Sequence, residues 1–116
     1  MTSLSPLDDP GACGSHLLRF TAELLRATHP AKNAGERTRR LVRYGASARA
    51  GQAIVLGAKA RALLTGRPAV AREDLDACLL PALRHRVVLS FEAESEGLGV
   101  ADLLNEWVQT ADRASK

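Results

Sequence analysis

Apolar residues recur at the spacing of an amphipathic helix in four stretches of the chain, near residues 15–30, 47–65, 71–83 and 100–108. Each stretch has one row of apolar side chains that can face a common core. The rows are Leu17, Phe20, Leu24 and Leu25; Ala50, Ile54, Ala58 and Ala62; Leu75, Cys78, Leu79, Ala82 and Leu83; and Val100, Leu103, Leu104, Trp107 and Val108. The pattern predicts a small bundle of four helices, with Trp107 as a core anchor.

Capping and helix-breaking residues set the expected ends of these helices. Ser15 and Ser47 are predicted N-caps, because a serine hydroxyl can accept a hydrogen bond from a free N–H of the first turn. Pro30 should end the first helix and Gly66 the second. Pro81 lies inside the third stretch, where its missing N–H and its ring should kink the helix or split it into two short ones.

The segments between the predicted helices have mixed patterns. Residues 36–43 can form either a short turn of helix or an extended basic loop. The β-branched residues near 87–90 predict a short extended segment, and the acidic, glycine-containing stretch 92–99 predicts a loop. Residues 1–14 are predicted to be a flexible lead-in, which leaves one helical domain at 15–116.

Composition supports an all-α fold and excludes several other classes of protein. The 116 residues are 46% hydrophobic but only 3% aromatic, and alanine and leucine, which favour helices, predominate. No apolar run approaches the length of a membrane span, and the first residues do not resemble a secretory signal. Cys13 and Cys78 suit neither a disulfide framework nor a metal site, so we expect a reduced, cytoplasmic setting. Cys78 is interpreted as a core residue and Cys13 as an incidental residue of the lead-in.

Charge is unevenly distributed although the net charge is only +3. Basic residues dominate between Arg19 and Arg67, whereas acidic residues dominate from Glu73 onward, with Asp74 in a first helical turn where it suits the helix dipole. A basic half could meet phosphate on a nucleotide or a nucleic acid. The alternative is two solvated faces that attract each other within the bundle, and charge alone favours this second interpretation.

The chain lacks the motifs of an autonomous enzyme. It contains no Walker A loop to hold phosphates and no Walker B strand ending in acidic residues that could hold Mg²⁺. His16, His29 and His85 are too scattered to suggest a metal site, and no serine lies in a nucleophile elbow.

Three sequence blocks, in order, are similar to the C-terminal lid of the MoxR family of AAA+ ATPases. Gly45-Ala46-Ser47-Ala48-Arg49-Ala50 resembles the family's Gly-Ala-Ser-Pro-Arg-Ala. The second block runs from Ala58 to Leu64 and continues through Gly66-Arg67, Val70 and Glu73-Asp74-Leu75, and the third is Leu83-Arg84-His85-Arg86-Val87. The resemblance covers roughly residues 17–108.

The resemblance implies that the chain contributes to ATP binding and hydrolysis only together with an AAA+ core, in cis or in trans. Arg49 matches the sensor 2 arginine, which reaches the terminal phosphates of ATP bound with Mg²⁺ by that core. Gly45, Ala46 and Ser47 would line the adenine side of the pocket. The family's properties further imply a hexameric ring, chaperone-like remodelling and von Willebrand factor A-type partners. The chain would be either part of such an ATPase or a lone lid-like protein.

Each of these residues also has a purely structural interpretation. Arg49 could be a solvent-exposed residue paired with Glu36 or another nearby carboxylate, and Gly45–Ser47 could be no more than a helix-entry turn. His85 is interpreted as helping to end the third helix. The chain also departs from the family, because Ala48 replaces a proline and Thr28-His29 stands where many relatives have Thr-Arg.

A second hypothesis makes the chain a small basic helical module that binds nucleic acid or a protein partner. Its support is the cluster Arg37, Arg39, Arg40 and Arg43. These arginines precede a glycine break and do not line a recognition helix, so the pattern does not favour nucleic acid.

Overall fold

The computed structural model describes residues 13–31 and 34–115, which contain six helices and a two-stranded sheet. The elements in chain order are α1 (Ser15–Ala27), α2 (Glu36–Leu41), β1 (Val42–Tyr44), α3 (Ala48–Leu64), α4 (Arg72–Leu83), β2 (Val88–Leu89), α5 (Phe91–Ser95) and α6 (Val100–Ala114). The four long helices are those that the sequence predicts, and the all-α fold class is confirmed. No helix among these residues is both long and apolar enough to cross a membrane.

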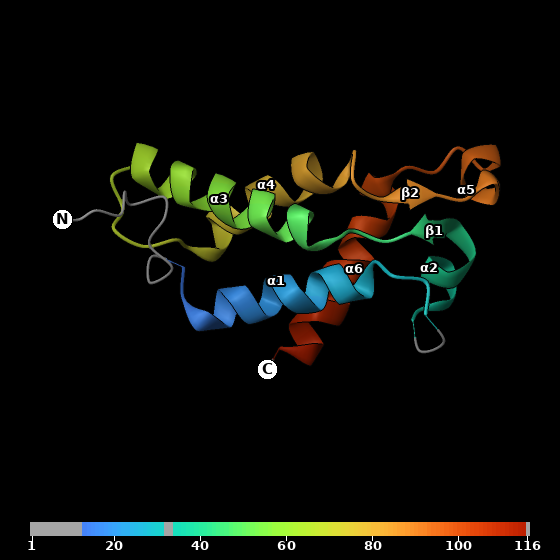
Figure 1. Ribbon diagram of the computed structural model, residues 1–116, viewed down its shortest axis with the longest axis horizontal. Coiled ribbons are helices and arrows are strands. Elements are labelled where there is room, and N and C mark those ends of the chain that lie inside the picture. The colour runs from blue at the N-terminus through green and yellow to red at the C-terminus, as the bar shows by residue number, and fades with distance from the viewer. Residues whose placement is uncertain (1–12, 32–33, 116) are drawn as a thin grey trace.

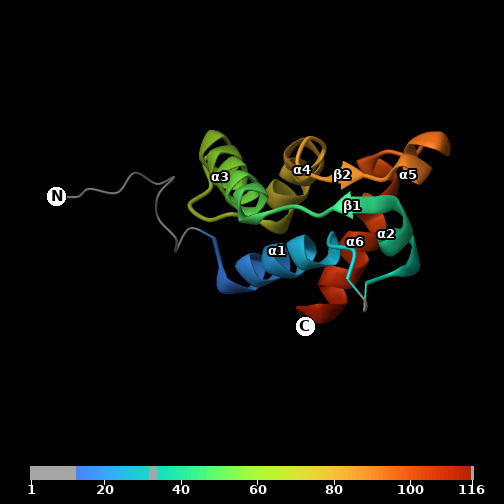
Figure 2. The same ribbon diagram turned by 45° about the vertical axis from the view of Figure 1, so that its right-hand side comes forward.

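Two pairs of long helices make up the body of the molecule (Figures 1 and 2). Helix α3 packs along α4, and α6 crosses α1. Contacts between α1 and α3, and between α4 and α6, join the two pairs. The sheet and the short helices α2 and α5 lie together at one end (Figure 1). The segment that connects β1 to α3 passes above the end of α1, which brings residues far apart in sequence side by side.

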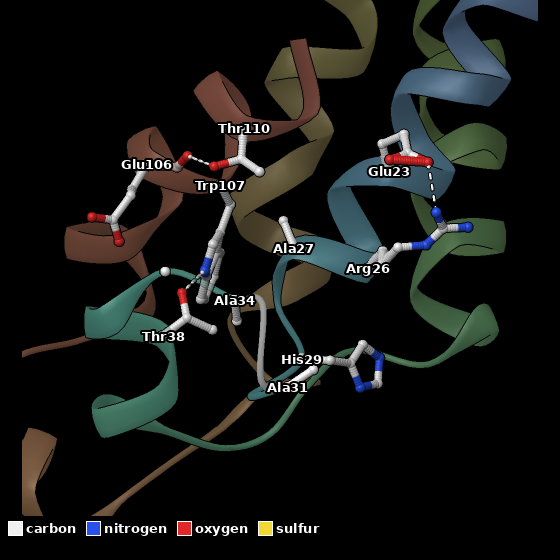
Figure 3. A pocket seen from close by; sticks show the side chains of 11 residues that line it. Glu23, Arg26, Ala27, His29, Ala31, Ala34, Thr38, Glu106, Trp107 and Thr110 are labelled. Atoms are coloured by element: carbon white, nitrogen blue, oxygen red, sulfur yellow. Dashed lines mark hydrogen bonds and ion pairs between the residues drawn. The ribbon is translucent and has the colours of Figure 1, made fainter. Parts of the chain in front are cut away.

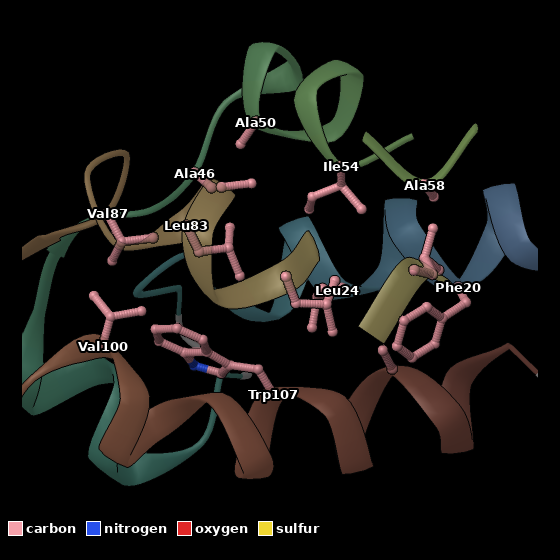
Figure 4. Packing of buried hydrophobic residues seen from close by; sticks show 14 of the residues in the cluster. Phe20, Leu24, Ala46, Ala50, Ile54, Ala58, Leu83, Val87, Val100 and Trp107 are labelled. Carbon is pink, nitrogen blue, oxygen red and sulfur yellow. The ribbon is translucent and has the colours of Figure 1, made fainter. Parts of the chain in front are cut away.

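The core lies between these helices and is filled from all of them (Figure 4). Trp107 is 1% exposed and its Nε1 donates a hydrogen bond to Thr38 Oγ1 at 2.9 Å, which ties α6 to α2. Ala50, Ile54 and Ala58 of α3 are fully buried, and the alanines allow the neighbouring helices to approach closely. The predicted apolar row of α3 and the anchoring role of Trp107 are therefore confirmed.

The sheet explains the ambiguous stretch 36–43. This stretch contains a short helix, α2, that changes directly into β1, which pairs antiparallel with β2 in the register Val42↔Leu89 and Tyr44↔Val88. The Ser90 N–H donates to Leu41 O at 2.8 Å, and the Ser90 hydroxyl donates to Arg40 O at 3.0 Å. The predicted extended segment near 87–90 is confirmed, and its pairing partner lies more than forty residues earlier in the chain.

One predicted helix cap and one predicted loop are wrong, and Pro81 does not split its helix. Gly14, not Ser15, is the N-cap of α1, and no side chain caps that helix. The acidic stretch 92–99 is not all loop, because the Ser90 hydroxyl accepts from Ala93 N–H at 3.3 Å and begins α5. Helix α4 runs through Pro81 without a break. Pro81 and Ala77, whose carbonyl loses its usual donor, are both exposed, so water can reach this turn.

The two cysteines are both free thiols, but their positions differ from those expected. Cys13 is 2% exposed and belongs to the core, so its interpretation as an incidental residue is wrong. Residues 1–12 of the predicted lead-in lie outside the described residues. Cys78 is only half-buried and packs against Gly57. Burial raises the pKa of both thiols, which makes them poorer nucleophiles at neutral pH.

Candidate functional site

The segment Gly45–Arg49 leads from β1 into α3. Ser47 is the N-cap of α3, as predicted, with an extended backbone and a hydroxyl that accepts from the Arg49 N–H at 3.3 Å. The helix begins at Ala48, which places Arg49 in its first turn. The Ala50 N–H donates to Ser47 O at 3.0 Å, so two N–H groups of this turn already bond to the cap residue.

Charge at this helix start is positive and unopposed. The first turn of α3 contains no acidic residue, and Ser47, Ala48 and Arg49 are all exposed. None of the ion pairs among the described residues involves Arg49, so the alternative pairing with Glu36 is not observed. The helix dipole adds partial positive charge at the same place. The arrangement can therefore accept an anion from outside the chain.

The C-cap of α1, Thr28, and the residue after it, His29, hold the backbone of this segment. Thr28 Oγ1, which is fully buried, accepts the Ala46 N–H at 2.9 Å and donates to Leu25 O at 2.6 Å. His29 Nε2 lies 2.8 Å from Ala46 O and donates to it when that nitrogen carries the proton. The backbone N–H and the backbone carbonyl of Ala46 are thus bonded to the side chains of two consecutive residues, Thr28 and His29.

Gly45 is required by the close approach of His29. A Cβ on Gly45 would lie 2.7 Å from His29 Cγ and 2.9 Å from His29 Cα. The second of these atoms belongs to the backbone and cannot swing away. Sequence reasoning missed this role of Thr28 and His29, and only the departure from Thr-Arg drew attention to their position.

A cavity of about 170 Å³ borders His29 between the C-terminal half of α1, the start of α2 and the middle of α6 (Figure 3). Glu23 and Arg26 at its edge form an ion pair of 3.1 Å. Oε2 of Glu106 is buried and has no hydrogen-bond partner within residues 13–31 and 34–115. The same residues contain no cluster of three or more histidine, cysteine, aspartate or glutamate side chains that could hold a metal ion.

The basic cluster that could have met nucleic acid is partly neutralised within the fold. Arg40 Nη1 lies 2.6 Å from both Glu92 Oε2 and Glu96 Oε2. The hydrogen bonds to Glu96 and Glu92 raise the pKa of Arg40. The predicted attraction between the basic and acidic halves is therefore observed here, and no contact supports the nucleic-acid alternative.

The Leu83–Val87 block ends α4. His85 is exposed in the turn that follows the helix, whereas Arg86 Nη1 donates to Ala82 O at 3.0 Å. Among these residues it is Arg86 that bonds a carbonyl of the last turn of α4. Cations suit this end of a helix, where carbonyl groups are left without partners.

A buried carboxylate, that of Asp74, bonds the backbone at the start of α4. Asp74 is 0% exposed; its Oδ2 accepts the Ala71 N–H at 2.9 Å, and its Oδ1 accepts from Arg67 Nη2 at 2.5 Å. Arg61 Nε lies 3.3 Å from the same Oδ1. Burial opposes the charged form most strongly, but the Ala71 N–H and the two arginines together outweigh it and lower the pKa of Asp74.

Comparison with known proteins identifies the class. The family model described as AAA lid domain matches residues 34–107, which include the Gly45–Arg49 segment, the sheet and most of α6. The match covers more than half of the chain. The chain therefore belongs to the AAA lid domain family.

Similar proteins indicate which type of AAA lid domain this chain is. The chain is 35% identical over 69 residues to Chaperone MoxR1 of Mycobacterium tuberculosis, and 44% identical over 61 residues to Protein MoxR of Paracoccus denitrificans. These matches cover 60% and 51% of the chain but only 18% of each relative. A solved structure of a "putative ATPase" from Cytophaga hutchinsonii superposes with a TM-score of 0.79 at 31% identity, over 85% of this chain and 30% of that one. The chain is a lid domain of the MoxR type.

Proposed function

We propose that the chain is the sensor 2 lid of an AAA+ ATPase and acts on ATP that is bound, with Mg²⁺, by an AAA+ core in cis or in trans. The observation that carries this proposal is Arg49 in the acid-free first turn of α3, exposed and in no ion pair with residues 13–31 or 34–115. The MoxR-type relatives supply the context in which such an arginine has a phosphate to meet.

Arg49 has the chemistry that the role needs. A guanidinium is always charged and carries donors in a fixed fork that matches phosphate oxygens. Negative charge on the transferred phosphoryl group is stabilised by positioned cations during hydrolysis. Gly45, Ala46 and Ser47 would lie along the adenine side of the nucleotide, with Ser47 also capping the helix that carries Arg49. Mg²⁺ ligands and water activation would come from the core.

The wider setting is part of the same proposal. The name Chaperone MoxR1 supports remodelling of other proteins by the complete assembly. We propose a hexameric ring, von Willebrand factor A-type partners and a cytoplasmic location, the last because Cys13 and Cys78 are free thiols.

The test is ATP hydrolysis by the chain joined to an AAA+ core. We predict that Arg49→Ala lowers kcat on the order of a thousandfold, because a cation that faces the transferred phosphate is lost. Arg49→Lys should retain part of the rate, since it keeps the charge but loses the fork. Arg113→Ala is the matched control, because Arg113 is an exposed arginine on another helix, in the last turn of α6. Unchanged turnover in Arg49→Ala would refute the sensor assignment.

A further inference from the structure

We propose that His29 is a positioning residue for Arg49 and acts, together with Thr28, through the peptide groups of Ala46; the inference rests on the proposed function of Arg49. Thr28 accepts the Ala46 N–H at 2.9 Å, and His29 Nε2 contacts Ala46 O at 2.8 Å. These two bonds cross 18 and 17 residues of sequence. They fix one residue of the connection between β1 and α3 to the end of α1.

The fixed residue lies directly before the helix cap. Ala46 precedes Ser47, whose carbonyl accepts the Ala50 N–H at 3.0 Å and whose hydroxyl accepts the Arg49 N–H. The orientation of the Ala46 peptide groups therefore sets the direction in which α3 begins. A few residues on, α3 touches α1 again at Gly51, where a Cβ would lie 2.8 Å from Leu25 Cδ1. Arg49 lies between these two points of attachment.

The two hydrogen bonds from Thr28 and His29 to Ala46 form a clamp on the connection between β1 and α3. This clamp needs a hydrogen-bond donor on His29, not a charge. Ala46 O can only accept, so Nε2 must carry a proton, as it does in one neutral tautomer and in the imidazolium. No bond from Nδ1 is found among the residues that the structure describes.

Packing alone is the competing explanation, because the His29 ring also lies against Gly45. Two substitutions separate the two effects. His29→Phe keeps a ring over Gly45 but removes the donor. His29→Gln removes the ring, but its amide nitrogen can reach as far as Nε2 and donate to Ala46 O.

Amide hydrogen exchange on the 116-residue chain tests the clamp without any nucleotide. His29→Phe should speed exchange of the Ala46 N–H about tenfold, because a partly buried bond to the same residue is lost. His29→Gln should exchange nearly as slowly as the natural chain. Thr21→Val is the matched control, since the Thr21 hydroxyl bonds only to Leu17 O within α1. Unaltered exchange of the Ala46 N–H in His29→Phe would overturn the proposal.

ATP hydrolysis with an AAA+ core tests whether the clamp serves Arg49. His29→Phe should lower kcat about tenfold and leave KM within about twofold, as expected when a contact made in the transition state is misaligned. His29→Gln should restore the rate. The double variant His29→Phe, Arg49→Ala should be no slower than Arg49→Ala alone, because the two residues act as one unit. Losses that multiply would overturn the positioning role, whereas a silent Arg49→Ala would refute the proposed function instead.

Discussion

Helices α3 and α4 both begin beside arginines, but they satisfy their first turns in opposite ways. At α4 the buried carboxylate of Asp74 bonds the Ala71 N–H and pairs with Arg67 and Arg61. At α3 the first turn holds no acid, Ser47 provides the cap, and Arg49 is exposed, with no ion-pair partner in the described part of the chain. The backbone before α3 is held by neutral hydrogen bonds from Thr28 and His29.

The two helix starts differ in whether their charges are matched within the described part of the fold. The charges around Asp74 are matched within the fold, and their place is to join α3, α4 and the turn between them. The start of α3 instead carries an exposed cation at the positive end of the helix dipole, where the proposed function needs one. The stability of this helix start comes from the neutral hydrogen bonds of Ser47, Thr28 and His29, which do not neutralise Arg49.

The largest effect on stability should follow from removing the Asp74 carboxylate at the start of α4. Asp74→Ala removes the capping acceptor and leaves Arg67 without its buried partner, so the free energy of unfolding should fall by about 2–3 kcal/mol. Denaturant unfolding measures this change. Asp76→Ala is the control, because the Asp76 pair with Arg72 is exposed and should contribute less than about 1 kcal/mol. Equal losses in the two variants would mean that the Asp74 network is not structural.

A somewhat smaller effect should follow from a side chain at the approach to α3. Gly45→Ala forces a Cβ against the backbone of His29 and should cost about 1–2 kcal/mol. Gly35→Ala meets nothing within 4 Å and should cost less, even though Gly35 is the N-cap of α2. Thermal unfolding compares the two variants. A Gly45→Ala protein as stable as Gly35→Ala would show that the clamp is loose.

Making α3 resemble α4 should affect function without harming the fold. Ser47→Asp keeps a good cap and adds a favourable carboxylate at the helix start, worth up to about 1 kcal/mol. The same carboxylate would compete with phosphate for Arg49, so ATP hydrolysis with a core should fall on the order of tenfold. Ser90→Asp, at the cap of α5, is the control. Full activity of Ser47→Asp would contradict an open anion site at α3.

The smallest effect is a loss of stability at acidic pH, where the Asp74 carboxylate becomes protonated. The pKa of Asp74 is lowered by folding, so its contribution to stability is present above its unfolded pKa and is lost as pH falls through its folded pKa. The natural chain should therefore lose stability below about pH 4, whereas Asp74→Asn should lose less over the same range. Unfolding midpoints at several pH values measure the gap between the two. A gap that does not narrow in acid would contradict the assignment.

Local sequence signals were sufficient for the long helices and for the start of α3. Apolar spacing placed α1, α3, α4 and α6, and a serine after a glycine marked the cap at Ser47. These features depend on neighbours within a few residues, so a single sequence contains their cause. Arg49 was selected by resemblance, and its phosphate role stays a prediction.

Features that depend on distant residues were not predictable. The roles of Thr28 and His29 come from bonds to Ala46 across 18 and 17 residues, and the pairing of β1 with β2 crosses more than forty. Burial of Cys13 likewise depends on what packs over it. Pro81 suggested a break, but an exposed turn tolerates the lost hydrogen bond.

The most direct test of the central claim is a crystal structure of the chain with its AAA+ core and a non-hydrolysable ATP analogue. The claim predicts that the Arg49 guanidinium donates hydrogen bonds of about 2.7–2.9 Å to terminal phosphate oxygens, with the Ala46 peptide groups still bonded to Thr28 and His29. Arg49 pointing into solvent or paired with a core carboxylate, while the phosphates meet other residues, would contradict it.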